Sequence, residues 1–300
     1  MKYKFTRRSF LAAGFSAATG LAVSGCSSMQ PLFAGKDERR FKVGACDWTL
    51  GHRAQPSSFA AARELGLDGV QIAAGDRKGE NQMSMLDSKK REEICSAARE
   101  NNIKIASIGM AILNQVPLKS SDEAPVYVSK MIDLVDVFEP DARVILLAFF
   151  GDGDLLDEKR QLDKAARDVV VERLKSLADK AQANDVVLGI ESWLSAQQHM
   201  DIIERVGSPA LKVYYDVGNS HKAGYDIYKE IRQLGDNICE FHAKDYDDLY
   251  GKGSIDFVEV RKAMDDIGYS GWIQIEGTQF PIGRMRGLKY DADYLRTVFA

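Results

Sequence analysis

The stretch from Val186 to Gly277 contains four short apolar runs, which read VVLGIE (186–191), LKVYYD (211–216), NICEFH (237–242) and WIQIE (272–276). Continuous apolar runs of this length, each followed by a polar or glycine-containing segment, are typical of buried parallel strands. They recur at intervals of roughly 25 to 35 residues, about the length of one strand-helix unit. Each run ends on a residue that can bind a metal, namely Glu191, Asp216, His242 and Glu276. Because such strand ends meet at one edge of a sheet, we expect the four side chains to converge.

The rest of the chain from Phe41 onward alternates strand and helix signals in the same way. We expect strands at 42–46, 69–73, 103–108 and 143–149 and near 186, 211, 237 and 272. We expect helices at 57–65, 88–101, 122–138, 162–183, 197–206, 226–234, 256–267 and 292–299. Eight such units in about 260 residues predict an α/β fold, a single-domain (β/α)8 TIM barrel over residues 41–300. A doubly wound sheet is the alternative, but neither a GxGxxG after the first strand nor a Walker A pattern supports it.

Residues 1–25 have the pattern of an export signal rather than of a folded domain. TRRSFL (6–11) is a twin-arginine pattern, and the weakly apolar segment that follows carries no charge and is short for a membrane-spanning helix. VSGC (23–26) resembles a lipobox, which predicts lipidation of Cys26; a plain signal peptide with a chance cysteine is the alternative. We therefore expect Tat export to the periplasmic side, membrane attachment only through a lipid anchor at Cys26, and a tether over 26–40.

Composition narrows the class of protein. The 300 residues are 45% hydrophobic and 28% charged, which is ordinary for a soluble globular protein. The net charge of −4 gives no support for a surface that binds nucleic acid. The four cysteines are scattered without a CxxC pair, so neither a disulfide framework nor a zinc ribbon is indicated.

The four strand-end residues together predict a site for one divalent metal ion. Three carboxylates and one imidazole form an oxygen-rich donor set, which suits Mn²⁺ best and also fits Mg²⁺, Co²⁺ or Zn²⁺. Three converging carboxylates would repel one another in a half-buried pocket, and a divalent cation relieves that repulsion. The alternative is that each residue is only a helix cap or a salt-bridge partner.

The same strands resemble those of a known family. GIESW (189–193), YYDVGNSH (214–221), EFHAKD (240–245) and IQIEG (273–277) are similar to the metal-binding strands of the xylose isomerase-like TIM-barrel superfamily, with GKGSIDF (251–257) as a supporting loop. The resemblance covers the chain from about Phe41 to its end. It implies that Glu191, Asp216, His242 and Glu276 hold the metal, and that Glu191 and Glu276 also act as catalytic acid and base on opposite faces of a sugar.

The resemblance implies an isomerase or epimerase that removes a proton next to a carbonyl and passes through a metal-stabilised enediolate. Elimination from the same intermediate would instead make a lyase or dehydratase, acting on a 3-keto-glycoside or keto-polyol. A sugar-binding lipoprotein without catalysis is a second alternative. Enzymes similar to D-tagatose 3-epimerase carry His and Arg where this chain has Asn219 and Asp248, which weakens the case for ketohexose epimerisation.

Several further residues are predicted to contact the substrate. Lys244 stands in an HxKD pattern similar to that of the dehydratase and isomerase branches, and is predicted to bind a substrate oxygen and assist catalysis; a surface pair with Asp245 is the alternative. Aromatic strand-end residues make platforms for a sugar ring. The predicted substrate-binding set is Trp48, Trp193, Asn219, His221 and Lys244. Export argues for an unphosphorylated sugar or keto-glycoside, and a homodimer is possible because similar barrels often dimerise.

Overall fold

The computed structural model describes residues 40–76, 79, 81–138, 142–277 and 279–300. The chain divides into two units, Met1–Glu38 and Arg39–Ala300, and every described residue belongs to the second unit. The predicted export signal over 1–25, Cys26 and the predicted tether up to residue 39 lie outside the described residues. Among the helices that are described, none combines the length and the apolar character needed to cross a membrane.

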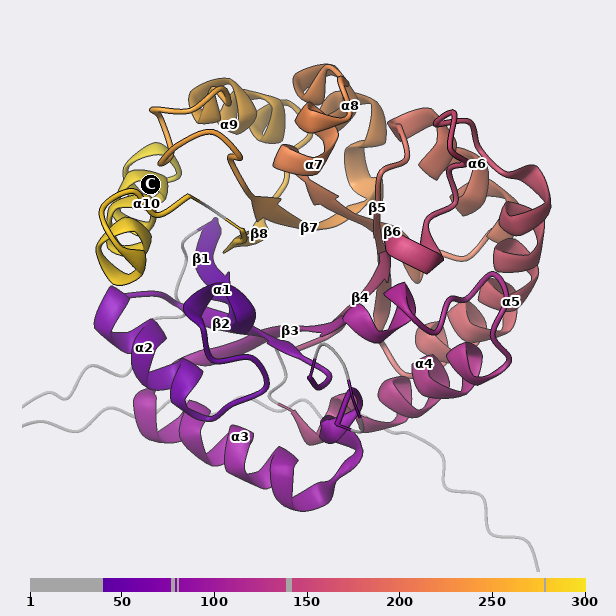
Figure 1. The fold of residues 1–300 in the computed structure, drawn as a ribbon, viewed down its shortest axis with the longest axis horizontal. Helices are drawn as coiled ribbons and strands as arrows, with labels where there is room; N and C mark the ends of the chain where they lie inside the picture. The colour runs from indigo at the N-terminus through magenta and orange to yellow at the C-terminus, as the bar shows by residue number, and fades with distance from the viewer. Residues whose placement is uncertain (1–39, 77–78, 80, 139–141, 278) are drawn as a thin grey trace, which may run out of the picture. The chain divides into compact units, whose positions relative to one another are not determined.

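Eight parallel strands close into a barrel in sequence order, which confirms the predicted single-domain TIM barrel (Figure 1). Hydrogen bonding between the first and last strands, with Phe41 opposite Gly271, completes the closure. The strands form where the sequence has short runs rich in Val, Ile and Leu, whose branched side chains pack on both faces of a parallel sheet. They are β1 (Phe41–Cys46), β2 (Gly69–Ala73), β3 (Lys104–Met110), β4 (Val144–Phe149), β5 (Val187–Ser192), β6 (Leu211–Asp216), β7 (Ile238–Ala243) and β8 (Gly271–Ile275).

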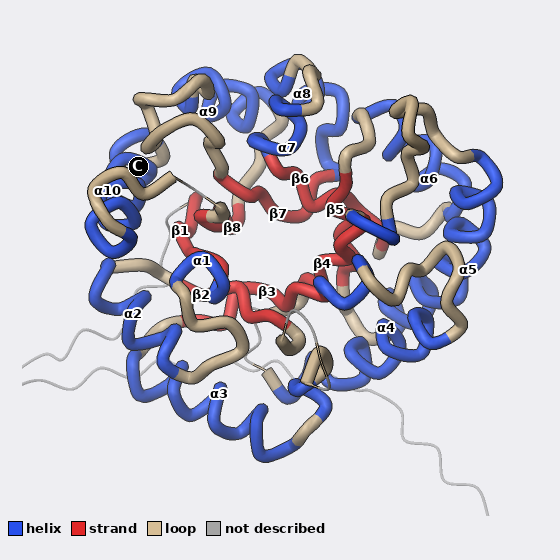
Figure 2. Tube along the Cα trace, in the orientation of Figure 1, coloured by secondary structure: helices blue, strands red, loops and turns tan. Residues whose placement is uncertain are grey.

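The longer helices lie outside the strands and cover the barrel (Figure 2). Several begin at a residue whose side chain caps the first turn: Asp163, Asp226 and Asp256 accept backbone N–H groups, and Ser195 forms a capping box with Gln198. The α-helices are α1 (Asp47–Leu50), α2 (Ser57–Leu65), α3 (Ser88–Asn101), α4 (Glu123–Leu134), α5 (Lys164–Ala183), α6 (Ala196–Val206), α7 (Val217–Lys222), α8 (Ile227–Leu234), α9 (Phe257–Asp266) and α10 (Arg284–Val298).

The final helix is where the sequence prediction was least accurate. We expected it to begin at Ala292, but α10 begins at Arg284. Gly287 stands in its first turn, and a glycine inside a helix costs about 1 kcal/mol relative to alanine, which hides the start of the helix from the sequence. Leu288 and Leu295 are buried and hold the helix against the barrel.

The strand register brings the four predicted metal-binding residues to the same end of the barrel. Asp216 lies opposite His242 in the β6–β7 pair, and His242 lies opposite Gln274 in the β7–β8 pair. Glu191 is the second-last residue of β5, and Glu276 follows the last residue of β8 directly. The four side chains therefore meet at the carboxyl ends of neighbouring strands, where TIM barrels carry their active sites.

Candidate functional site

Glu191, Asp216, His242 and Glu276 converge on one point at the carboxyl end of the barrel. Each offers one ligand atom, and these atoms all lie within 4.8 Å of one another. Glu191, Asp216 and His242 are buried, and Glu276 is half-buried. Three carboxylate oxygens and one ring nitrogen at this spacing could hold a metal ion.

Neighbouring groups fix the orientation of two of the carboxylates. Asp216 is the N-cap of α7, and its Oδ1 accepts the backbone N–H of Asn219 at 2.8 Å. This bond leaves Oδ2 facing the cluster, 4.0 Å from Nδ1 of His242. Glu191 Oε1 accepts the side-chain amide of Asn219 at 3.2 Å and lies 3.2 Å from Nδ1 of His242. The short helix α7 therefore positions Asp216 directly and Glu191 through Asn219.

The two ring nitrogens of His242 face different partners. Nε2 lies 2.8 Å from Oε1 of Gln71, a buried amide oxygen that can only accept. Nε2 therefore carries a proton, and Nδ1 is the nitrogen directed at Glu191 and Asp216. A neutral imidazole whose distant nitrogen donates to such an acceptor is the usual form of a metal-binding histidine.

Lys244 supplies a positive charge to the same carboxylates. It follows β7 and is 9% exposed, and its Nζ donates to Oδ2 of Asp216 at 3.3 Å and to Oε2 of Glu276. An ammonium group held between two of the ligand carboxylates shows that this donor set stabilises a cation. Lys244 is therefore buried at the site, and the sequence alternative of an exposed surface pair with Asp245 does not describe it.

Burial and charge act on these groups in opposite directions. Burial raises the pKa of Asp216 to about 7, and the carboxylates of Glu276 and Glu191 add to the effect while Lys244 opposes it. Burial also disfavours ionisation of Glu276, but the charges of Lys244 and His242 and hydrogen bonds from Lys244 and Trp48 hold its pKa at about 2. Glu276 is thus kept as a carboxylate.

Two glycines make room for the side chain of Lys244. A Cβ on Gly218 would lie 2.7 Å from Cβ of Lys244, and a Cβ on Gly277 would lie 2.8 Å from its Cε. Gly277 also has a φ of +58°, a conformation that residues with side chains rarely adopt. Gly218 and Gly277 therefore leave the space through which the side chain of Lys244 reaches Asp216 and Glu276.

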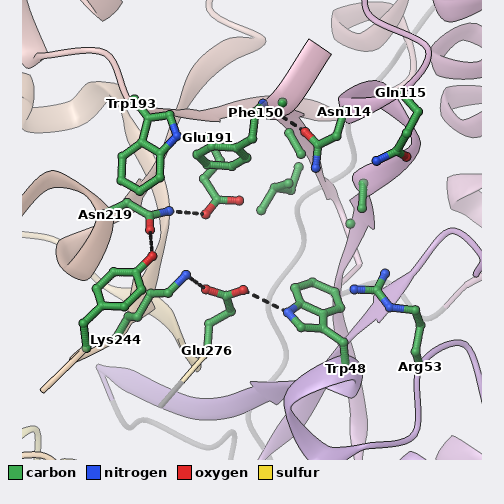
Figure 3. A pocket seen from close by; sticks show the side chains of 16 residues that line it. Trp48, Arg53, Asn114, Gln115, Phe150, Glu191, Trp193, Asn219, Lys244 and Glu276 are labelled. Carbon is green, nitrogen blue, oxygen red and sulfur yellow. Dashed lines mark hydrogen bonds and ion pairs between the residues drawn. The ribbon is translucent and has the colours of Figure 1, made fainter. Parts of the chain in front are cut away.

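A cavity of about 430 Å³ opens beside the cluster, and both Glu191 and Glu276 point into it (Figure 3). Its walls include aromatic rings on opposite sides. Trp48 donates its indole N–H to Oε1 of Glu276 at 2.9 Å. Phe150 and Trp193 meet edge to face, with ring centroids 5.5 Å apart. Aromatic faces combined with convergent polar groups are typical of sites that bind small ligands such as sugars.

The structure brings most of the predicted substrate-binding residues into this cavity. Trp48, Trp193, Asn219 and Lys244 line it. His221 is exposed on α7 and is not among the lining residues. Phe150 also lines the cavity, while the adjacent Phe149 is buried in the core.

Sequence reasoning missed several lining residues, chiefly Arg53, Asn114, Gln115 and Tyr246. The guanidinium of Arg53 lies over the ring of Trp48, 4.9 Å from its centroid. The hydroxyl of Tyr246 donates to Oδ1 of Asn219 at 2.6 Å. All four follow the carboxyl end of a strand, three to seven residues after its last residue. That position was the available signal, because loops at this end of a barrel form its active site.

Comparisons with known proteins agree with this architecture. A family model described as xylose isomerase-like TIM barrel matches residues 59–298. The putative L-ribulose-5-phosphate 3-epimerase SgbU of Escherichia coli (strain K12) is 27% identical over 247 residues, which cover 74% of this chain and 82% of that protein. The D-psicose 3-epimerase of Enterocloster bolteae is 27% identical over 125 residues, which cover 39% of this chain and 40% of that protein.

Solved structures share the fold at lower sequence identity. The D-psicose 3-epimerase of Clostridium cellulolyticum H10, solved with D-tagatose, superimposes with a TM-score of 0.69 at 20% identity, covering 86% of this chain and 99% of the other. A xylose isomerase-like TIM barrel protein from Mycobacterium smegmatis, solved in complex with magnesium, has a TM-score of 0.65 at 18% identity, covering 86% and 96%. Because the family model spans most of the chain, this protein belongs to the xylose isomerase-like TIM-barrel family.

Proposed function

We propose that this protein is a divalent-metal-dependent sugar isomerase or epimerase that acts on an unphosphorylated sugar or keto-sugar. The observation that carries the proposal is the pair Glu191 and Glu276, two carboxylates that reach the same cavity from β5 and from the end of β8. Two carboxylates on either side of a substrate provide one group to remove a proton and one to return it. Similarity to sugar epimerases supports this reading.

Glu191, Asp216, His242 and Glu276 would hold the ion. Their oxygen-rich donor set favours Mn²⁺, with Mg²⁺, Co²⁺ or Zn²⁺ as alternatives. When bound, the cation neutralises the negative charge that builds up on a substrate carbonyl oxygen as the neighbouring carbon loses a proton.

The side chains around the cavity would divide the remaining work. Glu276, kept ionised by Lys244 and Trp48, would accept the proton. Glu191, oriented by Asn219, would serve the other face of the substrate. Lys244 would donate to a substrate oxygen, and the rings of Trp48 and Trp193 would bind the apolar faces of the sugar.

The charges around the cavity support an unphosphorylated substrate. Among its lining residues the cationic side chains are Arg53 and Lys244. Lys244 already contacts two carboxylates, and Arg53 lies over the ring of Trp48. Arg284, on the helix that follows β8, donates instead to the carbonyl of Thr49 at 2.7 Å. A phosphate group is normally bound by several charge-assisted donors.

The test combines metal analysis with an exchange assay. The purified protein is analysed for bound metal and then incubated with Mn²⁺ and free sugars or keto-glycosides in D₂O, while NMR follows deuterium entering the carbon next to the carbonyl. Glu276→Gln should lower the exchange rate by roughly 10²- to 10⁴-fold, the usual contribution of a general base. Glu92→Gln, at an exposed position of α3, is the control and should keep the wild-type rate.

The products separate the possible reactions. An epimer or isomer supports the proposal, whereas loss of a leaving group would make the protein a lyase. Wild-type protein that binds no divalent metal and exchanges no proton from any sugar would refute the proposal and favour a binding protein.

We also propose that the chain is exported by the Tat pathway, anchored to the membrane through a lipid on Cys26, and active as a homodimer. Radiolabelled fatty acid should enter the wild-type protein but not Cys26→Ser. Labelling of both proteins would place the lipid elsewhere, and labelling of neither would remove the anchor.

A further inference from the structure

A chain of three hydrogen bonds runs from His242 into the interior of the barrel. Nε2 of His242 donates to Oε1 of Gln71 at 2.8 Å, and Nε2 of Gln71 donates to Oγ of Ser107 at 3.1 Å. Ser107 in turn donates to Oε2 of Glu240 at 2.9 Å. The chain crosses from β7 to β2 and β3 and returns to β7, and all four side chains are at most 2% exposed.

Glu240 is the terminal acceptor of this chain. Its Oε2 also accepts the hydroxyl of Tyr214 at 2.8 Å, so two hydroxyl protons point at the same oxygen. A carboxyl group inside a barrel is expensive to bury, and an aliphatic residue would fill the space at lower cost. Residues 240 and 242 face the same side of β7 because side chains alternate along a strand. Glu240 therefore lies directly below the predicted metal ligand.

Because Glu240 is the final acceptor, it sets the direction of every hydrogen bond in the chain. Because Ser107 gives its proton to Glu240, its oxygen must accept from the amide N–H of Gln71. The amide oxygen of Gln71 then faces His242, where it also receives the thiol of Cys46 at 3.1 Å. His242 must therefore carry a proton on Nε2, so that Nδ1, 3.2 Å from Oε1 of Glu191, is the nitrogen available to a metal.

Reversing the chain would have the opposite effect on the site. If the hydroxyl of Ser107 pointed at Gln71, the amide would turn and present its NH₂ group to Nε2 of His242. The imidazole proton would then reside on Nδ1, the nitrogen 3.2 Å from Glu191, and would block a metal from that nitrogen.

We propose that Glu240 is a positioning residue that, through Ser107 and Gln71, keeps the proton of His242 on Nε2 and Nδ1 open to a metal. This inference rests on the proposed metal site but goes beyond its four ligands. It assigns a role to a buried carboxyl group that lies outside the cavity and outside the ligand cluster.

The test compares two substitutions at one position. Glu240→Met removes the acceptor and keeps much of the volume, whereas Glu240→Gln retains an oxygen that can accept from Ser107. Glu240→Met should weaken Mn²⁺ binding by about 10- to 100-fold, the usual effect of losing an outer partner of a metal ligand. Glu240→Gln should bind Mn²⁺ with an affinity close to that of the wild type. Calorimetric titration of metal-free protein measures both affinities.

A second measurement reads the proton position directly and requires no enzyme activity. Long-range ¹H–¹⁵N NMR of histidine-labelled, metal-free protein at alkaline pH distinguishes the two neutral tautomers, and the chain has only four histidines. His242 should be the Nε2–H form in the wild type and should gain the Nδ1–H form in Glu240→Met. Ser107→Ala cuts the chain at its centre and should change both readouts in the same way, so it replaces Glu240→Met should that variant not fold.

Either of two results would overturn the inference. One is wild-type metal affinity and an unchanged tautomer in the variants that break the chain. The other is an equal loss in Glu240→Gln and Glu240→Met. Failure of the proposed function would look different, because the wild-type protein itself would then bind no metal, while the tautomer measurement would still report on the chain.

Discussion

Lys244→Met examines the buried ammonium group that lies between two of the ligand carboxylates. In the metal-free protein Nζ of Lys244 contacts Asp216 at 3.3 Å and also Glu276. Removing it leaves the carboxylates of Glu191, Asp216 and Glu276 clustered with the imidazole of His242. We expect the metal-free variant to be less stable than the wild type, and we expect a divalent metal to restore most of the difference.

The size of the expected loss of stability follows from the burial of the ion pair between Lys244 and Asp216. Lys244 is 9% exposed and Asp216 is 3% exposed, so water screens the interaction weakly. Removing one partner of a buried ion pair costs about 3 to 5 kcal/mol because the other charge stays behind without compensation. For a domain of this size each kcal/mol corresponds to roughly 2 to 4 °C in Tm, which gives a fall of roughly 6 to 20 °C.

Thermal unfolding with and without Mn²⁺ is the assay. In the variant the cation no longer competes with an ammonium group for the same carboxylates, so Mn²⁺ should raise Tm by more than it does in the wild type. Lys222→Met is the matched control. Lys222 and Lys244 both lie over the ring of Tyr246, but Lys222 is exposed. Equal Tm values for metal-free Lys244→Met and wild type would refute the reasoning, as would equal gains on adding Mn²⁺.

Two further predictions concern the groups that support the site. Gly277→Ala should lower the free energy of unfolding by about 1 to 3 kcal/mol, because the new Cβ meets Lys244 and the backbone there is left-handed; urea unfolding measures this, and an unchanged midpoint would show that the lysine moves freely. Burial raises the pKa of Asp47 from 3.8 to about 7 against hydrogen bonds from Ala73 and Ala54. The folded protein thus holds that proton more tightly than the unfolded chain, so the contribution to stability is full below about pH 4 and declines by up to about 4 kcal/mol as the pH rises to 7. Asp47→Asn should make the free energy of unfolding depend less on pH over this range. An unchanged slope would show that another group causes the pH dependence.

The ligand cluster could be predicted from the sequence because its members share a local signal. Each of the four ends a short apolar run, and parallel strands of a barrel carry their ends to one edge. The contacts of Lys244 with Asp216 and Glu276 could not be predicted in this way. Its side chain reaches Asp216 and Glu276 only because Gly218 and Gly277 lie beside it in the folded chain.

The buried chain below His242 depends on contacts that no local pattern contains. Gln71, Ser107 and Glu240 come from strands that are far apart in the sequence and meet inside the barrel. A polar residue within an apolar strand predicts only that some partner exists. The start of α10 was hidden for a different reason, since local helix propensity is low at Gly287 and packing of the helix on the barrel overrides it.

The two halves of the barrel contribute different residues to the cavity. The proposed metal ligands come from the consecutive strands β5 to β8, whereas Trp48, Arg53, Asn114, Gln115 and Phe150 reach the cavity from the ends of β1, β3 and β4. Substitutions in the first half can therefore reshape the space around a substrate without removing a metal ligand. Such separation favours evolutionary divergence and laboratory evolution, because libraries confined to Arg53, Asn114, Gln115 and Phe150 would sample new substrates while the metal ligands and Trp48, the hydrogen-bond donor to Glu276, stay unchanged.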